Sequence, residues 1–387
     1  MAAPDRAAEL APRLAAAAAA RRADLLESLR LISSVDAPSG NPVALAPVAD
    51  LLESWLASLD GRVTQHASAA GPQIEAEFGP PPAVTEERVL ALCHYDTVWP
   101  AGTLATRPFR VEGDVAHGPG VLDMHGGIVA TLGALELLGE LAPLRRPVRV
   151  LLTPDEETGS RASRDLVVAR AREAAIVLVP EPALPGGALK TARKGWITYR
   201  LRLRGRAAHA GLEPEAGLSA IDELVDRLIE LRLLADPAAG TTINCGVVRG
   251  GSAANVIAGS AEAEIDVRFP DASEEARIRA AFAKLRAARP GAELEVEELH
   301  SRPPLERTPA IAAAAERARA LGGLLGFEFG EGSAGGVSDG NLAAAEGVPV
   351  LDGLGPQGGG AHAIDEHVSL VSLVERTALI ALLLTEV

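Results

Sequence analysis

The sequence is poor in aromatic residues and in positive charge, and both shortages argue against a nucleic-acid partner. Phe, Trp and Tyr together make up 3% of the 387 residues, too few to supply the aromatic platforms on which single-stranded bases stack. Lys and Arg number 37 against 52 Asp and Glu, so the formal net charge is −15. Because a phosphate backbone binds to a basic surface, we expect no nucleic-acid partner.

Cysteine and long apolar runs are also scarce. Cys93 and Cys245 are the two cysteines of the chain and define neither a disulfide framework nor a thiolate metal site. No stretch approaches the roughly 20 consecutive apolar residues of a membrane span. Asp5 and Glu9 precede the alanine run Ala15–Ala20, and Arg21 and Arg22 follow it, which is the wrong charge order for a signal peptide. We therefore expect a cytoplasmic protein with no membrane partner.

Hydrophobic residues make up 48% of the chain, enough for a folded protein with two domains. Up to about residue 193 short apolar strands alternate with helices, which predicts an α/β fold with a doubly wound, mostly parallel sheet. From Ile197 to Arg204 apolar and polar residues alternate strictly, as in a sheet with one wet face. The elements expected from there run β-α-β-β-α-β, the order of a ferredoxin-like α+β unit. We predict that this unit, residues 194–306, is inserted into a catalytic domain made of residues 1–193 and 307–387.

Two helices are expected before the first strand. The apolar pattern from Arg6 to Ile32 predicts one long amphipathic helix. A second helix should begin with Asn41 as its cap and Pro42 at its first position, and end near Leu59.

Side chains that can bind metal follow four of the expected strands. His94 and Asp96 come directly after the apolar run 88–93, and further candidates follow the apolar runs 147–153, 176–179 and 348–351, namely Glu156, Glu157, Glu181 and His362. Asp123 lies in a glycine-rich loop between the first two of these strands. In open α/β sheets ligands bind beyond the carboxyl ends of the strands, so these side chains would converge if the strands are neighbours. Histidine and carboxylate without cysteine suit Zn²⁺ or a similar divalent ion.

The number of acidic groups favours two ions over one. A single catalytic ion takes three protein ligands and water, whereas this group offers five ligands and two further acids. Gathered without cations, several of the carboxylates would have to stay protonated. Neighbours on an extended backbone point in opposite directions, so of Glu156 and Glu157 one would bind metal while the other faces the substrate as general base.

The stretches that carry these residues resemble the aminoacylase/glutamate-carboxypeptidase family of dinuclear zinc hydrolases, and look closest to the bacterial glutamate carboxypeptidases. The resemblance covers nearly the whole chain and rests on residues 94–98 (HYDTV), 118–127 (GPGVLDMHGG), 155–160 (DEETGS), 181–182 (EP), 208–211 (AHAG) and 361–362 (AH). It implies two Zn²⁺ ions, with Co²⁺ or Mn²⁺ as substitutes, and a homodimer formed through the inserted lid and dimerisation domain. The implied reaction is hydrolysis of an amide bond next to a free α-carboxylate, in a short peptide or an N-acyl amino acid, with a glutamate-type residue favoured.

The resemblance assigns the metal ligands residue by residue. His94 and Glu181 would hold one zinc ion, and Glu157 and His362 would hold the other. Asp123 would bridge the two ions.

The resemblance also assigns the groups that act on the substrate. Asp96 would orient and polarise His94, and Glu156 would deprotonate the water between the ions and pass the proton to the leaving amine. His209 lies in a glycine-flanked loop, where a lone histidine is more often structural, but its counterpart in the family stabilises the tetrahedral oxyanion, usually from the other subunit. Asn255 and Arg268 resemble residues that hold the terminal carboxylate of the substrate, although Arg268 would also fit as an outward residue of an alternating strand.

Other interpretations remain open. Gly336 to Gly340 fits the G-x-S-x-G turn of serine hydrolases with Ser338 as nucleophile, and Asp352 and His362 follow in the matching order. No firm strand precedes that turn, and the serine-hydrolase interpretation assigns no role to the acidic residues. A glycine-rich loop at Gly336 that lines the substrate carboxylate therefore fits better. Further alternatives are an N-acyl amino acid deacylase with another side-chain preference and a non-catalytic relative that binds amino-acid-like ligands. His125, where the family often has lysine, is interpreted as a residue that supports the ligands from behind or as polarity at the start of a helix, rather than as a ligand.

Overall fold

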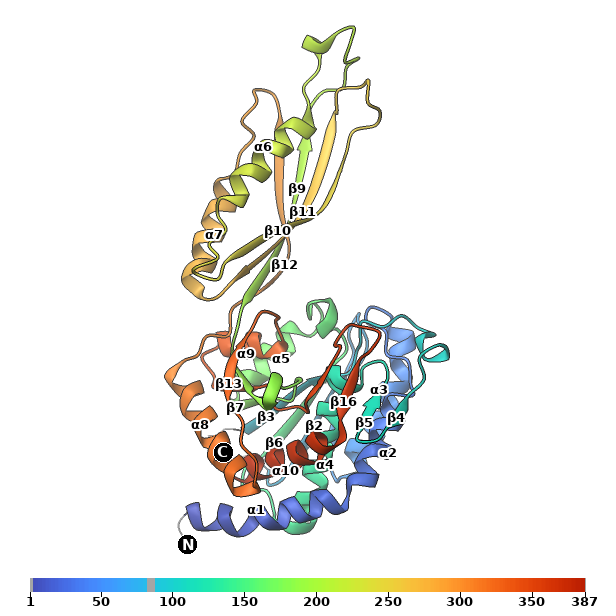
Figure 1. The fold of residues 1–387 in the computed structure, drawn as a ribbon, viewed down its shortest axis with the longest axis vertical. Coiled ribbons are helices and arrows are strands. Elements are labelled where there is room, and N and C mark those ends of the chain that lie inside the picture. The colour runs from blue at the N-terminus through green and yellow to red at the C-terminus, as the bar shows by residue number, and fades with distance from the viewer. Residues whose placement is uncertain (1–2, 82–87, 387) are drawn as a thin grey trace. The chain divides into compact units, whose positions relative to one another are not determined.

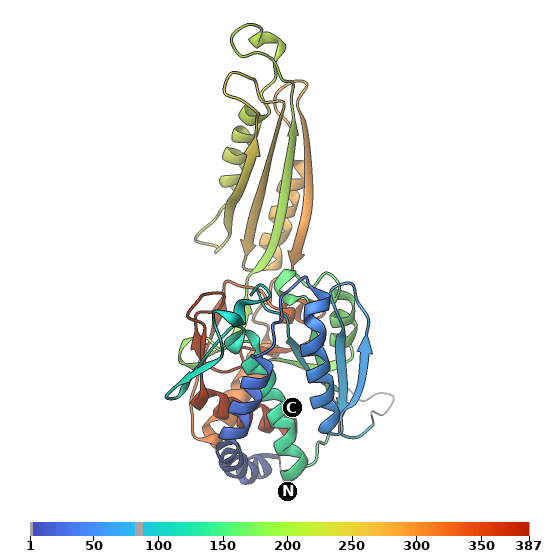
Figure 2. The same ribbon diagram turned by 90° about the vertical axis from the view of Figure 1, so that its right-hand side faces the viewer.

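The structure, a computed structural model, describes residues 3–81 and 88–386 (Figure 1, Figure 2). This part of the chain divides into two compact units. Unit 1 comprises Met1–Ala192, Arg307–Ala334 and Ser338–Val387, and unit 2 comprises Arg193–Glu306 and Gly335–Val337. The three residues from Gly335 to Val337, assigned to the catalytic domain in the sequence-based division, thus group with the inserted unit.

Unit 1 is built on a sheet whose eight strands, counted over the described residues, follow the order β1-β2-β6-β3-β7-β14-β8-β13. Four strands that are neighbours in this order run parallel: β6 (Val148–Thr153), β3 (Arg88–His94), β7 (Ala174–Val179) and β14 (Val350–Asp352). The outer strands are β1 (Arg62–His66), β2 (Gln73–Phe78), β8 (Leu189–Arg193) and β13 (Glu331–Ala334). β1 and β2 join antiparallel on one side, and β8 is antiparallel to β14 on the other. The predicted mostly parallel α/β sheet is confirmed.

Helices pack on this sheet, and one of them lies deep in the core. The helices of unit 1 are α1 (Ala3–Ala20), α2 (Arg22–Ile32), α3 (Pro42–Ser58), α4 (Gly126–Leu141), α5 (Arg164–Ala171), α8 (Pro309–Leu325), α9 (Asp339–Ala345) and α10 (Leu370–Glu386). α4 is apolar almost throughout and packs beside α10. Contrary to the expectation from the sequence, one stretch of the described residues, Val121–Leu141, is long and apolar enough to cross a membrane by length and composition, but 89% of its most apolar window is buried inside the fold, as in a core helix.

The start of helix α3 was predicted correctly, whereas the break between α1 and α2 was not predicted. Asn41 caps α3, its side chain accepting the Ala44 N–H at 3.1 Å, as predicted. The single helix expected from Arg6 to Ile32 is wrong, because α1 and α2 meet at Arg21, whose backbone leaves the helical region at φ −92°, ψ 13°. The Arg21 guanidinium reaches α4, where it forms an ion pair with Glu136 at 2.5 Å and a second one with Glu140. The break therefore coincides with ion pairs to residues more than 100 positions later in the chain.

A second, small sheet in unit 1 was not predicted. Over the described residues its strands follow the order β15-β16-β5-β4, with β4 at Arg110–Glu112, β5 at Val115–His117, β15 at Gly358–Gly359 and β16 at His367–Ser369. The antiparallel pair β16–β5 places His367 opposite His117. It therefore joins the chain segment that leads into the Asp123 loop to the segment that follows His362.

Unit 2 has the elements predicted for the inserted domain: β9 (Gly195–Arg204), α6 (Ala220–Arg232), β10 (Thr242–Gly250), β11 (Ser260–Phe269), α7 (Ala272–Lys284) and β12 (Glu293–Arg302). Its described strands form one antiparallel sheet in the order β10-β11-β9-β12. Alternate residues of β9, from Ile197 to Leu203, are buried, and α6 and α7 both pack against the sheet. The predicted β-α-β-β-α-β unit is confirmed.

Candidate metal centre

The side chains predicted to bind metal lie beyond the carboxyl ends of the four parallel strands. His94 is the last residue of β3, and Glu181 follows β7 by two residues. Glu156 and Glu157 follow β6 in a 3₁₀ turn, Glu156–Thr158, so the extended backbone expected for this pair is wrong. Because parallel neighbours present their ends at the same edge of the sheet, side chains distant in sequence meet there.

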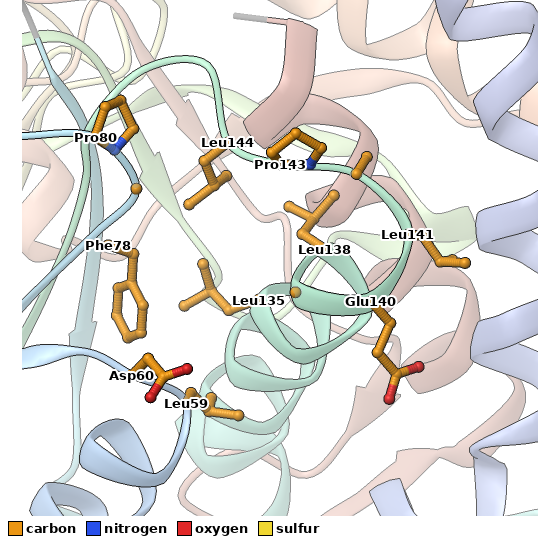
Figure 3. A pocket seen from close by; sticks show the side chains of 13 residues that line it. Leu59, Asp60, Phe78, Pro80, Leu135, Leu138, Glu140, Leu141, Pro143 and Leu144 are labelled. Atoms are coloured by element: carbon orange, nitrogen blue, oxygen red, sulfur yellow. The ribbon is translucent and has the colours of Figure 1, made fainter.

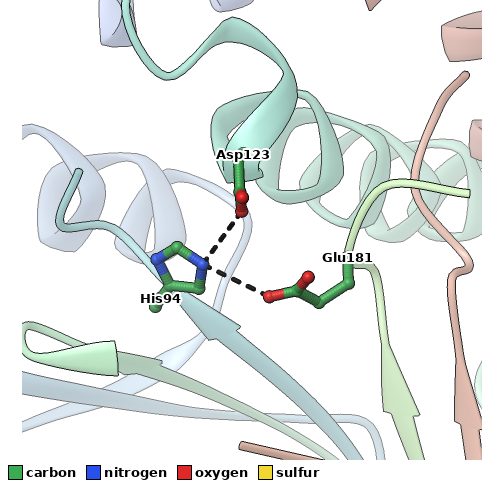
Figure 4. Close-up of side chains that lie close together, drawn as sticks. All are labelled: His94, Asp123 and Glu181. Carbon is green, nitrogen blue, oxygen red and sulfur yellow. Dashed lines mark ion pairs between the residues drawn. The ribbon is translucent and has the colours of Figure 1, made fainter. Parts of the chain in front are cut away.

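One group of candidate ligands consists of His94, Asp123 and Glu181 (Figure 4). The Nε2 atom of His94 lies 3.3 Å from Oδ1 of Asp123 and 3.4 Å from Oε1 of Glu181. The His94 side chain is 2% exposed and that of Glu181 is 8% exposed. Solvent therefore has little access to the His94 and Glu181 side chains of this group.

A second group shares Asp123 with the first. The Nε2 atom of His362 lies 3.4 Å from Oδ2 of Asp123 and 3.2 Å from Oε2 of Glu157. The Asp123 carboxylate thus turns one oxygen toward each histidine. The His362 side chain is 53% exposed, which leaves this group open to a substrate.

Asp96 connects the end of β3 to the turn after β6. Its side chain is fully buried and accepts the backbone N–H groups of Glu156 at 3.1 Å and Glu157 at 3.2 Å, together with the hydroxyl of Ser39 at 2.7 Å. The Nδ1 atom of His94 lies 3.0 Å from the Asp96 backbone carbonyl and 3.5 Å from its carboxylate. The carboxylate therefore holds the Glu156–Glu157 turn more directly than it holds His94.

Contact between histidines and carboxylates shifts the pKa values of the centre. Burial opposes the charged form of His94, yet the carboxylates around it raise its pKa well above the ordinary value. Asp123 and Glu157 raise the pKa of His362 to about 10. Burial, together with the charge of Asp123, raises the pKa of Glu157 to about 7. The arrangement thus attracts positive charge, in the form of protons or of metal ions, to the point where the carboxylates meet.

Several buried polar atoms of the centre form no hydrogen bond within the described part of the chain. Nε2 of His94, Oδ1 of Asp123 and Oε1 of Glu157 are buried and have no hydrogen-bond partner among the described residues. Buried polar atoms are nearly always paired, and all three are atoms that coordinate divalent metals in proteins. The residues present therefore fit two divalent ions that share the Asp123 carboxylate.

The residues predicted to act from the inserted domain lie in unit 2. The His209 and Asn255 loops are paired, because Ala210 N–H donates to the Asn255 carbonyl at 2.9 Å. Arg268 lies elsewhere, on β11, where its guanidinium donates to both carboxylate oxygens of Asp266 at 3.0 Å each. Asp266 thus occupies the Nε and Nη2 donors of the guanidinium, and the role of Arg268 stays a prediction.

The glycine-rich turn does not have the geometry of a nucleophilic serine. Ser338 is fully buried, caps α9, and donates its hydroxyl to Asp352 at 2.6 Å, whereas His362 forms ion pairs with Asp123 and Glu157. The Gly336 carbonyl accepts a hydrogen bond from Arg193 at 3.3 Å. Buried His125 contacts the Ser33 hydroxyl through Nδ1 at 3.1 Å and belongs to neither ligand group.

Three residues of the centre were missed by sequence reasoning. Ser39 contacts Asp96, as described above, and Lys190 places its Nζ atom 3.6 Å from Oε2 of Glu181. Glu366 accepts backbone N–H groups of the Asp123 loop. Glu366 could have been found from the sequence only through its position four residues after His362. No local sequence pattern identifies Ser39 or Lys190.

A hollow of about 570 Å³ lies away from this centre (Figure 3). It surrounds the C-terminal end of α4 between Leu135 and Leu144 and is lined largely by leucine and proline side chains. None of the predicted site residues lines it.

Comparisons with known proteins agree on one family. The sequence profile of peptidase family M20/M25/M40 matches residues 90–386. Carboxypeptidase G2 from Pseudomonas sp. (strain RS-16) is 31% identical over 375 residues, which cover 94% of this chain and 89% of that protein. Succinyl-diaminopimelate desuccinylase from Thioalkalivibrio sulfidiphilus is 28% identical over 309 residues, covering 75% of this chain and 81% of that protein. The crystal structure of a dinuclear metal-binding M20 peptidase from Bacillus subtilis has a TM-score of 0.68 at 18% identity, over 95% of this chain and 99% of that one.

Proposed function

Because the chain belongs to peptidase family M20/M25/M40 and is a metal-dependent hydrolase, we propose that it cleaves an amide bond next to a free α-carboxylate with the help of two zinc ions. The observation that carries the proposal is the pair of ligand groups that share Asp123. His94 and Glu181 would hold one ion, Glu157 and His362 the other. Two ions held there would supply a water of lowered pKa and polarisation of the scissile carbonyl group.

The side chains of the centre divide the remaining work. Glu156 follows the same strand as the ligand Glu157, and its backbone N–H is held by the buried Asp96 carboxylate. From there Glu156 takes the proton of the attacking water and passes it to the leaving amine. Asp96 keeps the turn in place and so fixes the base relative to the ligands.

His209 is suited to stabilise the oxyanion. It is exposed, and its Nδ1 accepts the backbone N–H groups of Gly211 and Leu212 at 3.1 Å each. The ring proton therefore sits on Nε2, which is left to donate a hydrogen bond to a developing negative charge.

Unit 2 also supports the proposed homodimer. The outer side of α6 carries exposed apolar side chains, Ile221 at 38%, Val225 at 49% and Ile229 at 56% exposure, and Val248 on β10 is 58% exposed. β10 is an edge strand of its sheet. A row of apolar residues beside an unpaired strand edge is a surface that another copy of the chain can cover.

The likeness to carboxypeptidase G2 favours a carboxypeptidase-type substrate, a short peptide or acyl derivative with a free terminal carboxylate, and the resemblance of the motifs to glutamate carboxypeptidases favours glutamate as its last residue. The likeness to the desuccinylase favours the alternative, an N-acyl amino acid with another side chain. Turnover of a panel of dipeptides and N-acyl amino acids by the zinc-loaded protein separates the two, because the preferred residue next to the carboxylate is read directly. The cytoplasmic location stays a prediction from the sequence.

The assignment of the base is tested by a pair of neighbouring variants. Glu156→Gln should keep two zinc ions per chain and lose about 10²–10⁴-fold in kcat. Glu157→Gln should lose metal, measured by elemental analysis after dialysis, because its carboxylate faces His362. Activity retained in Glu156→Gln would refute its role as base, and a chain that binds no divalent metal would overturn the two-metal proposal.

The placement of His209 is tested by mixing subunits. If it acts on the site of the partner, inactive His209→Ala and Glu156→Gln protomers should regain part of the activity when exchanged into one dimer. Absence of recovery, with exchange demonstrated by mass spectrometry, would mean that the site lies within one chain.

A further inference from the structure

The carboxylate of Glu366 is buried, with the residue 1% exposed, and is surrounded by hydrogen-bond donors. Its Oε2 accepts the Gly120 backbone N–H at 2.9 Å and the Trp99 indole N–H at 2.8 Å. Its Oε1 accepts the backbone N–H groups of Leu122 at 3.1 Å and Asp123 at 3.2 Å. One side chain thus satisfies three backbone donors of the loop that carries the shared ligand Asp123.

The same residue also holds the loop of His362. Glu366 follows His362 by four residues and donates its backbone N–H to the Ala363 carbonyl at 3.1 Å. Its own carbonyl accepts the Gly118 N–H at 3.4 Å, and β16, which begins at the next residue, pairs with β5. Glu366 is therefore the point at which the Asp123 loop and the His362 loop are joined.

Neither loop has regular secondary structure to hold its ligand. Asp123 has φ −113° and ψ 98°, outside the helical region, inside the turn Val121–His125. His362 has φ +62°, in the left-handed region that non-glycine residues seldom adopt. Without the Glu366 carboxylate the buried N–H groups of the Asp123 loop would lose their acceptor, at a cost of about 1–3 kcal/mol for each unsatisfied group.

We propose that Glu366 is a positioning residue that holds the Asp123 and His362 loops together, so that the ligand group of Asp123, Glu157 and His362 forms only while its carboxylate is in place. The proposal rests on the two-metal function proposed above. Glu366 does not touch the metals; it acts through the backbone of Asp123 and through the short chain back to His362.

The test is a titration of the full-length protein, stripped of metal, with Co²⁺ followed by visible absorption and by counting bound ions after dialysis. Glu366→Gln replaces one carboxylate oxygen with an NH₂ group that faces two N–H donors. We expect the affinity for the second Co²⁺ to fall about 10–100-fold, the range for residues that hold metal ligands from behind, with a changed Co²⁺ spectrum. Glu366→Asp keeps the charge and should recover part of the affinity.

Glu223 in unit 2 provides a matched control. It is a fully buried carboxylate that accepts the backbone N–H groups of Ala288 at 2.8 Å and Arg289 at 3.0 Å. Glu223→Gln should lower the melting temperature and leave both Co²⁺ affinities and the spectrum unchanged. This comparison separates a role in stability from a role at the metal centre.

The outcomes distinguish this inference from the function on which it rests. Two Co²⁺ ions bound to Glu366→Gln with wild-type affinity and spectrum would overturn the positioning role and leave the two-metal function standing. A wild-type chain that binds fewer than two ions would overturn both. Should Glu366→Gln fail to fold, Trp99→Phe removes a single donor to the same carboxylate and should shift the second affinity in the same direction by a smaller factor; no shift would overturn the proposal.

Discussion

Gly127, the second residue of α4, is the position where one added methyl group should disturb the candidate centre most. A β-carbon built on its backbone would lie 1.8 Å from the Pro180 carbonyl oxygen and 3.2 Å from Cε of Met124. Pro180 directly precedes the candidate ligand Glu181. Helix α4 therefore packs against the backbone that positions this ligand, and only glycine fits at the contact.

In Gly127→Ala the new β-carbon would lie 1.8 Å from the Pro180 carbonyl oxygen, and real β-carbons keep at least 3.0 Å. The two backbones must therefore move apart by about 1.2 Å. Overpacking of a core costs about 1–3 kcal/mol, and we expect about 3 kcal/mol because the atom in the way is backbone and not a flexible side chain. In a unit of this size that loss lowers the melting temperature by roughly 6–12 °C. The shift also displaces Glu181, so metal affinity should fall as well.

Gly139, on the same helix, is the matched control. A β-carbon there meets nothing within 4 Å, and replacing a helical glycine by alanine stabilises by about 0.5–1 kcal/mol. The two variants carry the same chemical change and should move the melting temperature in opposite directions, measured by circular dichroism in the presence of a chelator. Equal melting temperatures for Gly127→Ala and Gly139→Ala would refute the reasoning.

Other expectations follow from the same geometry. Asp96→Asn keeps one acceptor oxygen but turns an NH₂ group toward the backbone N–H groups of the turn after β6. The affinity for Zn²⁺, measured by competition titration, should therefore fall about 10–100-fold. Wild-type affinity would contradict the supporting role of Asp96. Removing zinc with a chelator should abolish turnover and lower the free energy of unfolding by about 2.7 kcal/mol relative to protein held at a free Zn²⁺ concentration of 100 times Kd; a urea midpoint that does not move would count against the metal centre. Ser338→Ala should cost about 1 kcal/mol of stability as a lost helix cap and leave kcat/KM within a few-fold; loss of activity by orders of magnitude would favour the serine-hydrolase alternative.

Patterns that repeat over one element were read correctly from the sequence. The apolar run before His94 and the strict alternation of β9 each report how many faces of a strand are buried, which is a local property. The convergence of His94, Glu157, Glu181 and His362 could be predicted because parallel strands present their ends at one edge. The structure adds that the four strands are neighbours in the sheet.

Features that depend on a distant partner were not predicted. The helix break at Arg21 is accompanied by ion pairs with Glu136 and Glu140 on α4, and no local pattern signals it. The 3₁₀ turn at Glu156 is held from Asp96, which lies 60 residues earlier in the chain. The pairing of Arg268 with Asp266, only two residues away, was missed for another reason: alternation shows which face of a strand a residue lies on and not which neighbour it contacts.

The sequence by itself was enough to recognise the family, through motifs that resemble it, and to predict the fold class and the candidate ligands. Only the tertiary structure decided how those ligands are held. The Glu366 carboxylate accepts the backbone N–H groups of Gly120 and Leu122, which lie 246 and 244 residues earlier in the chain. No local pattern predicts such contacts, because the two loops are neighbours only in the folded chain, where β5 and β16 pair.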